Sequence, residues 1–246
     1  MTLLNFLLTG CYLHQPTGPM PVKNILAPRA IAHPPLVIVL PGRGDDLKAL
    51  QSKGIAEAIQ DGWPQADVLL AGATIGYYTR GEMVRRLHDE IIVPARAQGY
   101  HDIWLAGASM GGMGALLYEL KYPHDVRGLV LFAPYMGDNH LVEQIAAQGG
   151  LRHWNPGPVP AAVNADNYQL EIWRVAKDWS MHPNTARNVW LAAGNRDRLL
   201  PAAKLIAPAL PADHFIELPG GHAWKVWDPA AKQIFMRIAA QPRNSD

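Results

Sequence analysis

The sequence has little charge imbalance, a single cysteine and no long apolar run, and each shortage excludes a class of protein. Its 246 residues carry 22 basic and 21 acidic side chains, a formal net charge of +1. This balance argues against a nucleic acid or an anionic membrane surface as the partner. The one cysteine, Cys11, allows neither an intrachain disulfide nor a cysteine metal cluster. No apolar run approaches the roughly 20 residues that a transmembrane helix requires.

Three motifs of metal and nucleotide chemistry are also missing. The sequence contains no phosphate-binding P-loop, no His-Glu-x-x-His pair and no dinucleotide glycine fingerprint, so we expect neither a metal ion nor a cofactor. Hydrophobic residues make up 49% of the chain and charged residues 17%, which is enough apolar material for a sizeable core. The length is compatible with one large α/β domain, and we expect residues 1–246 to form a single domain.

The N-terminus allows two interpretations. Residues 8–11, Leu-Thr-Gly-Cys, resemble the lipoprotein box of bacteria, in which the cysteine is lipidated after cleavage. Against this, residues 1–10 hold no lysine or arginine, and their apolar run is short for a signal peptide. In the other interpretation, residues 3–8 are a strand and Cys11 is an ordinary buried cysteine. The sequence therefore leaves the location open between the cytoplasm and, if Cys11 is lipidated, the cell envelope.

Short apolar runs alternate with helical patterns, which favours a mostly parallel central sheet with helices on both faces. Residues 36–40 are apolar and β-branched, as in a buried central strand. Further strands are expected at 68–71, 103–106, 129–133, 189–193 and 215–218, and helices at 47–59, 82–97, 113–121 and 230–239. The alternation breaks at residues 138–187, which contain three tryptophans. We expect this segment to be a cap-like insertion over the carboxyl edge of the sheet that shapes a substrate pocket.

One turn has the pattern of a catalytic serine. Residues 107–111, Gly-Ala-Ser-Met-Gly, follow an apolar strand and precede a helix, the context of the glycine–any–serine–any–glycine elbow. Such a turn strains the backbone of the serine, and the flanking glycines avoid clashes with neighbouring elements. The same five residues also fit an ordinary tight turn in which Ser109 caps the helix. The strand and helix on either side favour Ser109 as a nucleophile.

The order of this serine, a later acid and a late histidine resembles the α/β-hydrolase superfamily, and residues 107–116 are similar to bacterial carboxylesterases. In that superfamily the acid follows the next-to-last core strand, which matches Asp197, and the histidine follows the last strand, which matches His222. Some members carry the acid one strand earlier, so Asp138 competes with Asp197. Asp197, flanked by two arginines, also fits a solvated loop acid.

The resemblance also implies an oxyanion hole made of backbone N–H groups. One belongs to Met110, the residue after the serine, and the other to the loop at residues 41–44. This loop begins with a proline where the family often has histidine, and Arg43 is the expected second donor. The Arg43 side chain either steers anionic substrates or pairs on the surface with a neighbouring aspartate.

Three aromatic residues are candidates to line a pocket for the acyl or alcohol group. Tyr77 and Tyr78 follow the strand at residues 68–71, and Trp224 lies just beyond the predicted histidine. Each fits simple core packing equally well, because half-buried aromatic side chains are common.

These residues predict a serine hydrolase that cleaves a small-molecule carboxylic ester through an acyl-enzyme on Ser109, with Asp197 and His222 completing the triad. A thioester or an amide would use the same machinery, and so would cofactor-free oxidation. A non-catalytic binding protein with the same fold is the alternative from another class. Such proteins usually lose the serine or the histidine, and this chain keeps both. The sequence does not indicate an oligomeric state.

Overall fold

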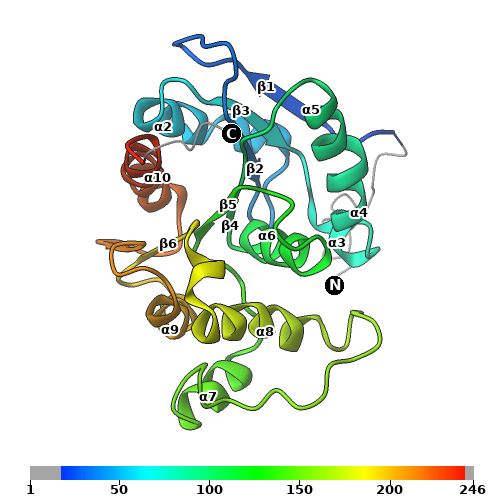
Figure 1. Cartoon of the computed structure of the whole chain (residues 1–246), viewed down its shortest axis with the longest axis vertical. Helices are drawn as coiled ribbons and strands as arrows, with labels where there is room; N and C mark the ends of the chain where they lie inside the picture. Colours follow the sequence, from blue (N-terminus) through cyan, green and yellow to red (C-terminus); the bar gives the residue numbers. More distant parts are fainter. Residues whose placement is uncertain (1–17, 242–246) are drawn as a thin grey trace, which may run out of the picture.

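A computed structural model describes residues 18–241 and contains one seven-stranded sheet (Figure 1). The strands are β1 (Val22–Ile25), β2 (Leu36–Leu40), β3 (Asp67–Ala71), β4 (Ile103–Ala108), β5 (Gly128–Phe132), β6 (Val189–Gly194) and β7 (Phe215–Leu218). Their order across the sheet is β1-β3-β2-β4-β5-β6-β7. Only the pair of β1 with β3 is antiparallel. The strand expected at residues 3–8, and Cys11, lie outside the described residues.

Helices cover both faces of this sheet, as the sequence predicted. In Figure 1, α2 and α10 lie on one side of the strands, and α4, α5 and α6 lie on the other. The α-helices are α1 (Leu47–Gln51), α2 (Ile55–Gly62), α3 (Ile75–Thr79), α4 (Met83–Leu87), α5 (Val93–Ala97), α6 (Met110–Lys121), α7 (Asn139–Ala147), α8 (Tyr168–Met181), α9 (Leu200–Ile206) and α10 (Trp224–Ala239). A π-helical turn, η1 (His88–Ile92), and two 3-10 turns, η2 (Pro183–Ala186) and η3 (Ala207–Ala209), complete the set.

The inner strands match the sequence prediction because they are buried on both faces. Every residue of β2, β3, β4, β5 and β6 is buried, so each strand is a continuous apolar run in the sequence rather than an alternating pattern. β1 is exposed over most of its length, as is usual at a sheet edge, and the sequence pattern did not indicate it. None of the helices in residues 18–241 is long and apolar enough to cross a bilayer.

All four predicted helices differ from the structure, and the one expected at residues 113–121 begins earlier, at Met110, as α6. The helix expected at residues 47–59 is divided into α1 and α2, because Gly54 has a φ of 82°. The helix expected at 82–97 is continuous as α4, η1 and α5, and its π-helical turn precedes Pro94, which has no N–H to donate. The closing helix expected at 230–239 begins earlier, at Trp224, and contains Pro229.

Residues 138–187 fold as α7, α8 and η2 between β5 and β6. α8 packs against α6 and η3, and α7 packs against α9. Trp154, Trp173 and Trp179 are each at most 2% exposed and belong to the same apolar core as the sheet. The tryptophans that suggested a pocket-shaping insertion therefore pack inside the protein. Figure 1 shows α7 and α8 at the end of the molecule away from β1.

Candidate active site

The turn between β4 and α6 holds Ser109 in a strained conformation. Its φ of 54° and ψ of −112° lie in a region that residues other than glycine rarely adopt. A Cβ at Gly107 would lie 2.3 Å from the carbonyl oxygen of Gly111, and a Cβ at Gly111 would lie 2.4 Å from that of Leu40. Both separations are far below van der Waals contact, so both flanking positions require glycine. The steric reason for the elbow pattern is therefore present in this turn.

Backbone hydrogen bonds hold this strained turn in place. The Ser109 N–H donates to the carbonyl oxygen of Phe132 at 2.9 Å, and the Ser109 carbonyl accepts from the N–H of Tyr135 at 2.9 Å. Both partners come from the end of β5 and the residues after it, so the neighbouring strand fixes the elbow. Ser109 is 7% exposed, which places its hydroxyl in a restricted part of the surface.

The loop after β6 and the loop after β7 bring Asp197 and His222 together. His222 Nδ1 lies 2.9 Å from each carboxylate oxygen of Asp197. The Asp197 side chain is 0% exposed, and its Oδ1 also accepts the N–H of Leu199 at 2.8 Å. Within residues 18–241, neither neighbouring arginine forms an ion pair with Asp197. Asp197 is thus a buried partner of the histidine and not a solvated loop acid.

Asp138 occupies a different environment. It is exposed at the start of α7, where Tyr135 and Gln169 donate hydrogen bonds to its carboxylate at 3.3 and 3.4 Å. His222 therefore has Asp197, and not Asp138, as its carboxylate partner in this structure.

Further contacts tie the two loops to each other. The Arg196 N–H donates to the Gly220 carbonyl at 2.8 Å, and the Gly220 N–H donates to Asn195 Oδ1 at 3.0 Å. Gly220 has a φ of 138°, which only glycine adopts readily. The imidazole also packs against the buried ring of Trp227 in a T-shaped arrangement, with 4.8 Å between ring centroids. The position of His222 is therefore set by the loop backbone and by an aromatic wall.

Ser109 and His222 line one cleft of about 490 Å³ at the carboxyl edge of the sheet. Within the described part of the chain, no hydrogen bond joins Ser109 Oγ to His222 Nε2. Such contacts are often long without substrate and tighten when substrate binds. The arrangement provides a strained serine and a carboxylate-bound imidazole that open onto the same space.

Gly42 lies beside the serine, as an oxyanion hole requires. A Cβ at Gly42 would lie 3.9 Å from Ser109 Cβ and 3.8 Å from the carbonyl oxygen of Ala108. Met110 is the first residue of α6, where backbone N–H groups have no partner within the helix. Arg43 follows Gly42 and lines the cleft. Both predicted donors thus belong to segments adjacent to Ser109.

The three predicted pocket residues have different surroundings. Trp224 lines the cleft, and its Nε1–H donates to Asp45 at 2.8 Å. Tyr77 is fully buried beneath the guanidinium of Arg86, and Tyr78 has a buried hydroxyl whose pKa is raised by burial. Neither tyrosine lines the cleft, and within residues 18–241 neither hydroxyl has a hydrogen-bond partner. Of the three predicted pocket residues, Trp224 alone lines the cleft with Ser109.

The sequence analysis did not identify several residues that line this cleft. They are Lys53, Arg198, Lys225 and Trp227, and they come from widely separated loops and from α10. No local pattern marks them, because their common feature is a shared position in space. The described residues contain no group of three or more His, Cys, Asp or Glu side chains placed to hold a metal ion.

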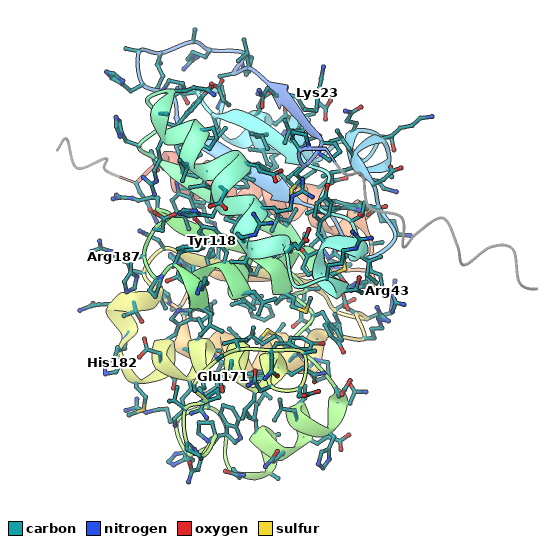
Figure 2. The ribbon with its side chains drawn as sticks, turned by 90° about the vertical axis from the view of Figure 1, so that its right-hand side faces the viewer. Lys23, Arg43, Tyr118, Glu171, His182 and Arg187 are labelled. Atoms are coloured by element: carbon teal, nitrogen blue, oxygen red, sulfur yellow. The ribbon has the colours of Figure 1, made fainter. Side chains whose placement is uncertain are left out.

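A larger cleft of about 610 Å³ lies at the amino ends of β5 and β6, away from the serine. Its lining includes Arg187, which appears on the left of Figure 2, whereas Arg43 of the serine cleft appears on the right. In open α/β sheets, ligands bind at the carboxyl ends of the strands. The serine cleft is therefore the better candidate despite its smaller volume.

The fold and the elbow are those of a serine hydrolase of the α/β-hydrolase type. The family model described as serine aminopeptidase, S33, a hydrolase family, matches residues 81–203. This match covers half of the chain, and the protein belongs to that family. The predictions of an α/β-hydrolase fold and of a hydrolase are confirmed. The matched range includes Ser109 and Asp197 and ends before His222.

Solved structures with the same fold span most of the chain. Est1E from Butyrivibrio proteoclasticus is 16% identical, with a TM-score of 0.58 over 90% of this chain and 95% of that one. An S-formylglutathione hydrolase from Staphylococcus aureus is 15% identical, with a TM-score of 0.60 over 89% and 90%. MPT51 from Mycobacterium tuberculosis is also 15% identical, with a TM-score of 0.62 over 91% and 94%. A search of the curated proteins found no match.

Proposed function

We propose that the protein hydrolyses carboxylic esters of small molecules through an acyl-enzyme on Ser109, with His222 as general base and Asp197 as its orienting acid. The observation that carries the proposal is that the strained serine and the imidazole bound to buried Asp197 open onto one cleft. A buried carboxylate without such a role would be costly to retain.

The reaction follows the chemistry of these groups. Ser109 Oγ attacks the ester carbonyl while His222 Nε2 takes its proton, and the same nitrogen then gives that proton to the leaving alcohol. Water, activated by His222, cleaves the acyl-enzyme and regenerates Ser109. The backbone N–H groups of Met110 and Arg43 are proposed to stabilise the oxyanion formed in each step.

Asp197 has the role of holding the proton on His222 Nδ1. Its two oxygens lie equally close to that nitrogen and can only accept in the ionised state. Nε2 is then the free acceptor that faces the cleft. The carboxylate also stabilises the imidazolium that forms when Ser109 is deprotonated.

We favour esters over the peptide amides that a serine aminopeptidase, the enzyme in the family description, would cleave. An aminopeptidase must bind a positively charged substrate amine, whereas the cleft is lined by four cationic side chains and one carboxylate. That carboxylate, Asp45, already pairs with Lys53 at 3.6 Å and accepts from Trp224. Est1E was also solved with ferulic acid bound, an observation about that protein that is in keeping with ester chemistry.

The test compares substrates and one nucleophile variant. The wild-type protein should hydrolyse 4-nitrophenyl acetate and butyrate, and it should not cleave aminoacyl 4-nitroanilides at a comparable rate. Ser109→Ala should lose several decades of ester hydrolysis, since the nucleophile and base act as a unit, and should keep the wild-type circular dichroism spectrum. Ester hydrolysis that survives in Ser109→Ala would refute the proposal.

A matched pair of substrates shows whether the protein prefers an oxygen ester or a thioester. Butyrate presented as an oxygen ester and as a thioester of similar size should give different kcat/KM values, and the larger value identifies the leaving-group chemistry. Binding of all these compounds without turnover would instead support the non-catalytic alternative.

A further inference from the structure

The walls of the serine cleft carry an excess of positive charge. Arg43 follows β2, Lys53 lies between α1 and α2, Arg198 follows β6, and Lys225 lies in the first turn of α10. All four line the same cleft, and among the described residues of its lining Asp45 is the only acid. The chain as a whole is almost balanced, with 22 basic and 21 acidic residues. The excess is thus a property of this site and not of the composition.

Three of the four cations have no acidic partner among residues 18–241. Lys53 pairs with Asp45 at 3.6 Å, and Trp224 donates to the same carboxylate at 2.8 Å. Arg43, Arg198 and Lys225 are exposed, and within residues 18–241 none of them forms an ion pair or a side-chain hydrogen bond. The one acid in the cleft is therefore already engaged, and three cationic groups remain available to a ligand.

These cations are close in sequence to the residues of the proposed chemistry and line the same cleft as Ser109 and His222. Arg43 directly follows Gly42, which lies beside Ser109, and Arg198 directly follows Asp197. Lys225 is three residues beyond His222. Three segments close to the proposed chemistry thus each present a cation: the loop after β2, the loop after β6 and the first turn of α10. A substrate positioned over Ser109 shares the cleft with these positive side chains.

We infer that the natural substrate is an ester whose non-reacting part carries an oxyanion, a carboxylate or a phosphate. This inference rests on the proposed ester hydrolysis and adds the substrate class. Arg and Lys side chains bind both oxyanions, and arginine matches their planar geometry with two donors. The rings of Trp224 and Trp227 supply an apolar wall for the remainder of the molecule.

The preference for an anionic over a neutral ester should be large enough to measure and should depend on salt concentration. An exposed ion pair changes an equilibrium constant by up to about fivefold, so two or three such contacts give a preference on the order of tenfold. The Debye length falls from about 30 Å at 0.01 M to about 3 Å at 1 M ionic strength, which screens exposed pairs. The preference for the anionic substrate should therefore shrink with added salt, whereas a preference based on shape should not.

The experiment uses pairs of esters that differ in charge and little in size. Monomethyl glutarate is compared with methyl pentanoate for an anion on the acyl side. The alcohol side is examined with the acetate esters of 4-hydroxybenzoate and 4-hydroxybenzamide, and 4-acetoxyphenyl phosphate replaces the carboxylate with a phosphate. We expect at least one anionic ester to exceed its neutral partner about tenfold in kcat/KM, mainly through KM, and to lose most of that advantage at high salt.

A double variant and a control variant test whether the cations cause the preference for anionic esters. Arg198→Gln combined with Lys225→Gln should lower the ratio of anionic to neutral kcat/KM severalfold, with Arg43 accounting for the remainder. Arg196→Gln is the matched control, because Arg196 is an exposed arginine of the same loop that does not line the cleft. The control should keep the wild-type ratio.

The outcomes separate this inference from the proposed function. If no ester of any charge is hydrolysed in a Ser109-dependent manner, the proposed function fails. If neutral esters are hydrolysed at least as well as every anionic partner, or if the double variant keeps the wild-type ratio, the substrate class is wrong and the ester hydrolase stands.

Discussion

The substitution Asp197→Asn tests the histidine with almost no change of volume. Leu199 N–H donates to Oδ1 at 2.8 Å, so the amide oxygen of asparagine has to take that position. The amide nitrogen then occupies the place of Oδ2, which is 2.9 Å from His222 Nδ1. The amide oxygen also stays 2.9 Å from Nδ1, but the NH₂ group beside it can only donate. A hydrogen bond from this group requires Nδ1 to be an acceptor, so the substitution favours the tautomer with the imidazole proton on Nε2.

An imidazole protonated at Nε2 cannot accept the proton of Ser109. The equivalent change in the best-studied triad costs about ten thousand-fold in kcat, or on the order of 5 kcal/mol at about 1.36 kcal/mol per decade. The Asp197 side chain is 0% exposed, so water on that side cannot replace it as the acceptor of the Nδ1 proton. We therefore expect a loss of about four decades in kcat for an ester substrate.

The assay is steady-state hydrolysis of 4-nitrophenyl butyrate, with thermal unfolding measured in parallel. Asp138→Asn is the matched control, because its exposed carboxylate binds Tyr135 and Gln169 and not the histidine. It should stay within about threefold of wild type, as expected of a surface substitution. If Asp197→Asn keeps more than a tenth of the wild-type rate while remaining folded, the assigned role of Asp197 is refuted.

Three further predictions concern stability. Gly111→Ala places a Cβ 2.4 Å from the Leu40 carbonyl oxygen and should lower the free energy of unfolding by about 1–3 kcal/mol or more, measured by urea titration; an unchanged midpoint would contradict this close packing. Burial raises the pKa of Asp228 to about 7, so the folded state holds its proton longer than the unfolded state. The contribution of Asp228 to stability should therefore decline as pH rises from about 4 to about 7. Asp228→Asn should remove this decline, and an identical pH profile of the two proteins would argue against it. Trp173→Ala removes a fully buried ring and should cost about 3–5 kcal/mol of stability. A stable variant with a changed preference for ester length would instead support the predicted pocket-shaping role of residues 138–187.

The inner sheet and the serine elbow are predictable because each depends on local sequence. Residues 36–40 form a strand with the predicted bounds, since burial on both faces leaves a continuous apolar run. The elbow pattern requires glycine at positions 107 and 111, and the contacts of both positions show why. Edge strand β1 has no such signal, because its side chains face solvent.

Long-range packing accounts for the features that sequence patterns did not indicate. The three tryptophans of residues 138–187 could equally line a pocket or fill a core, and only the folded chain, in which α8 packs against α6 and η3, shows that they are buried. Tyr77 and Tyr78 follow β3 at the correct edge of the sheet, yet both hydroxyl groups turn into the protein. Likewise, the four cations of the serine cleft are far apart in sequence and meet only in the folded chain.

Active-site labelling examines whether Ser109 is the nucleophile. The folded wild-type protein is treated with a fluorophosphonate probe, digested and examined by mass spectrometry, with Ser109→Ala treated in parallel. We expect a single phosphonylated residue, Ser109, with loss of ester hydrolysis in proportion to labelling and no adduct in the variant. An adduct on another residue that abolishes activity, or full activity after Ser109 is labelled, would contradict it.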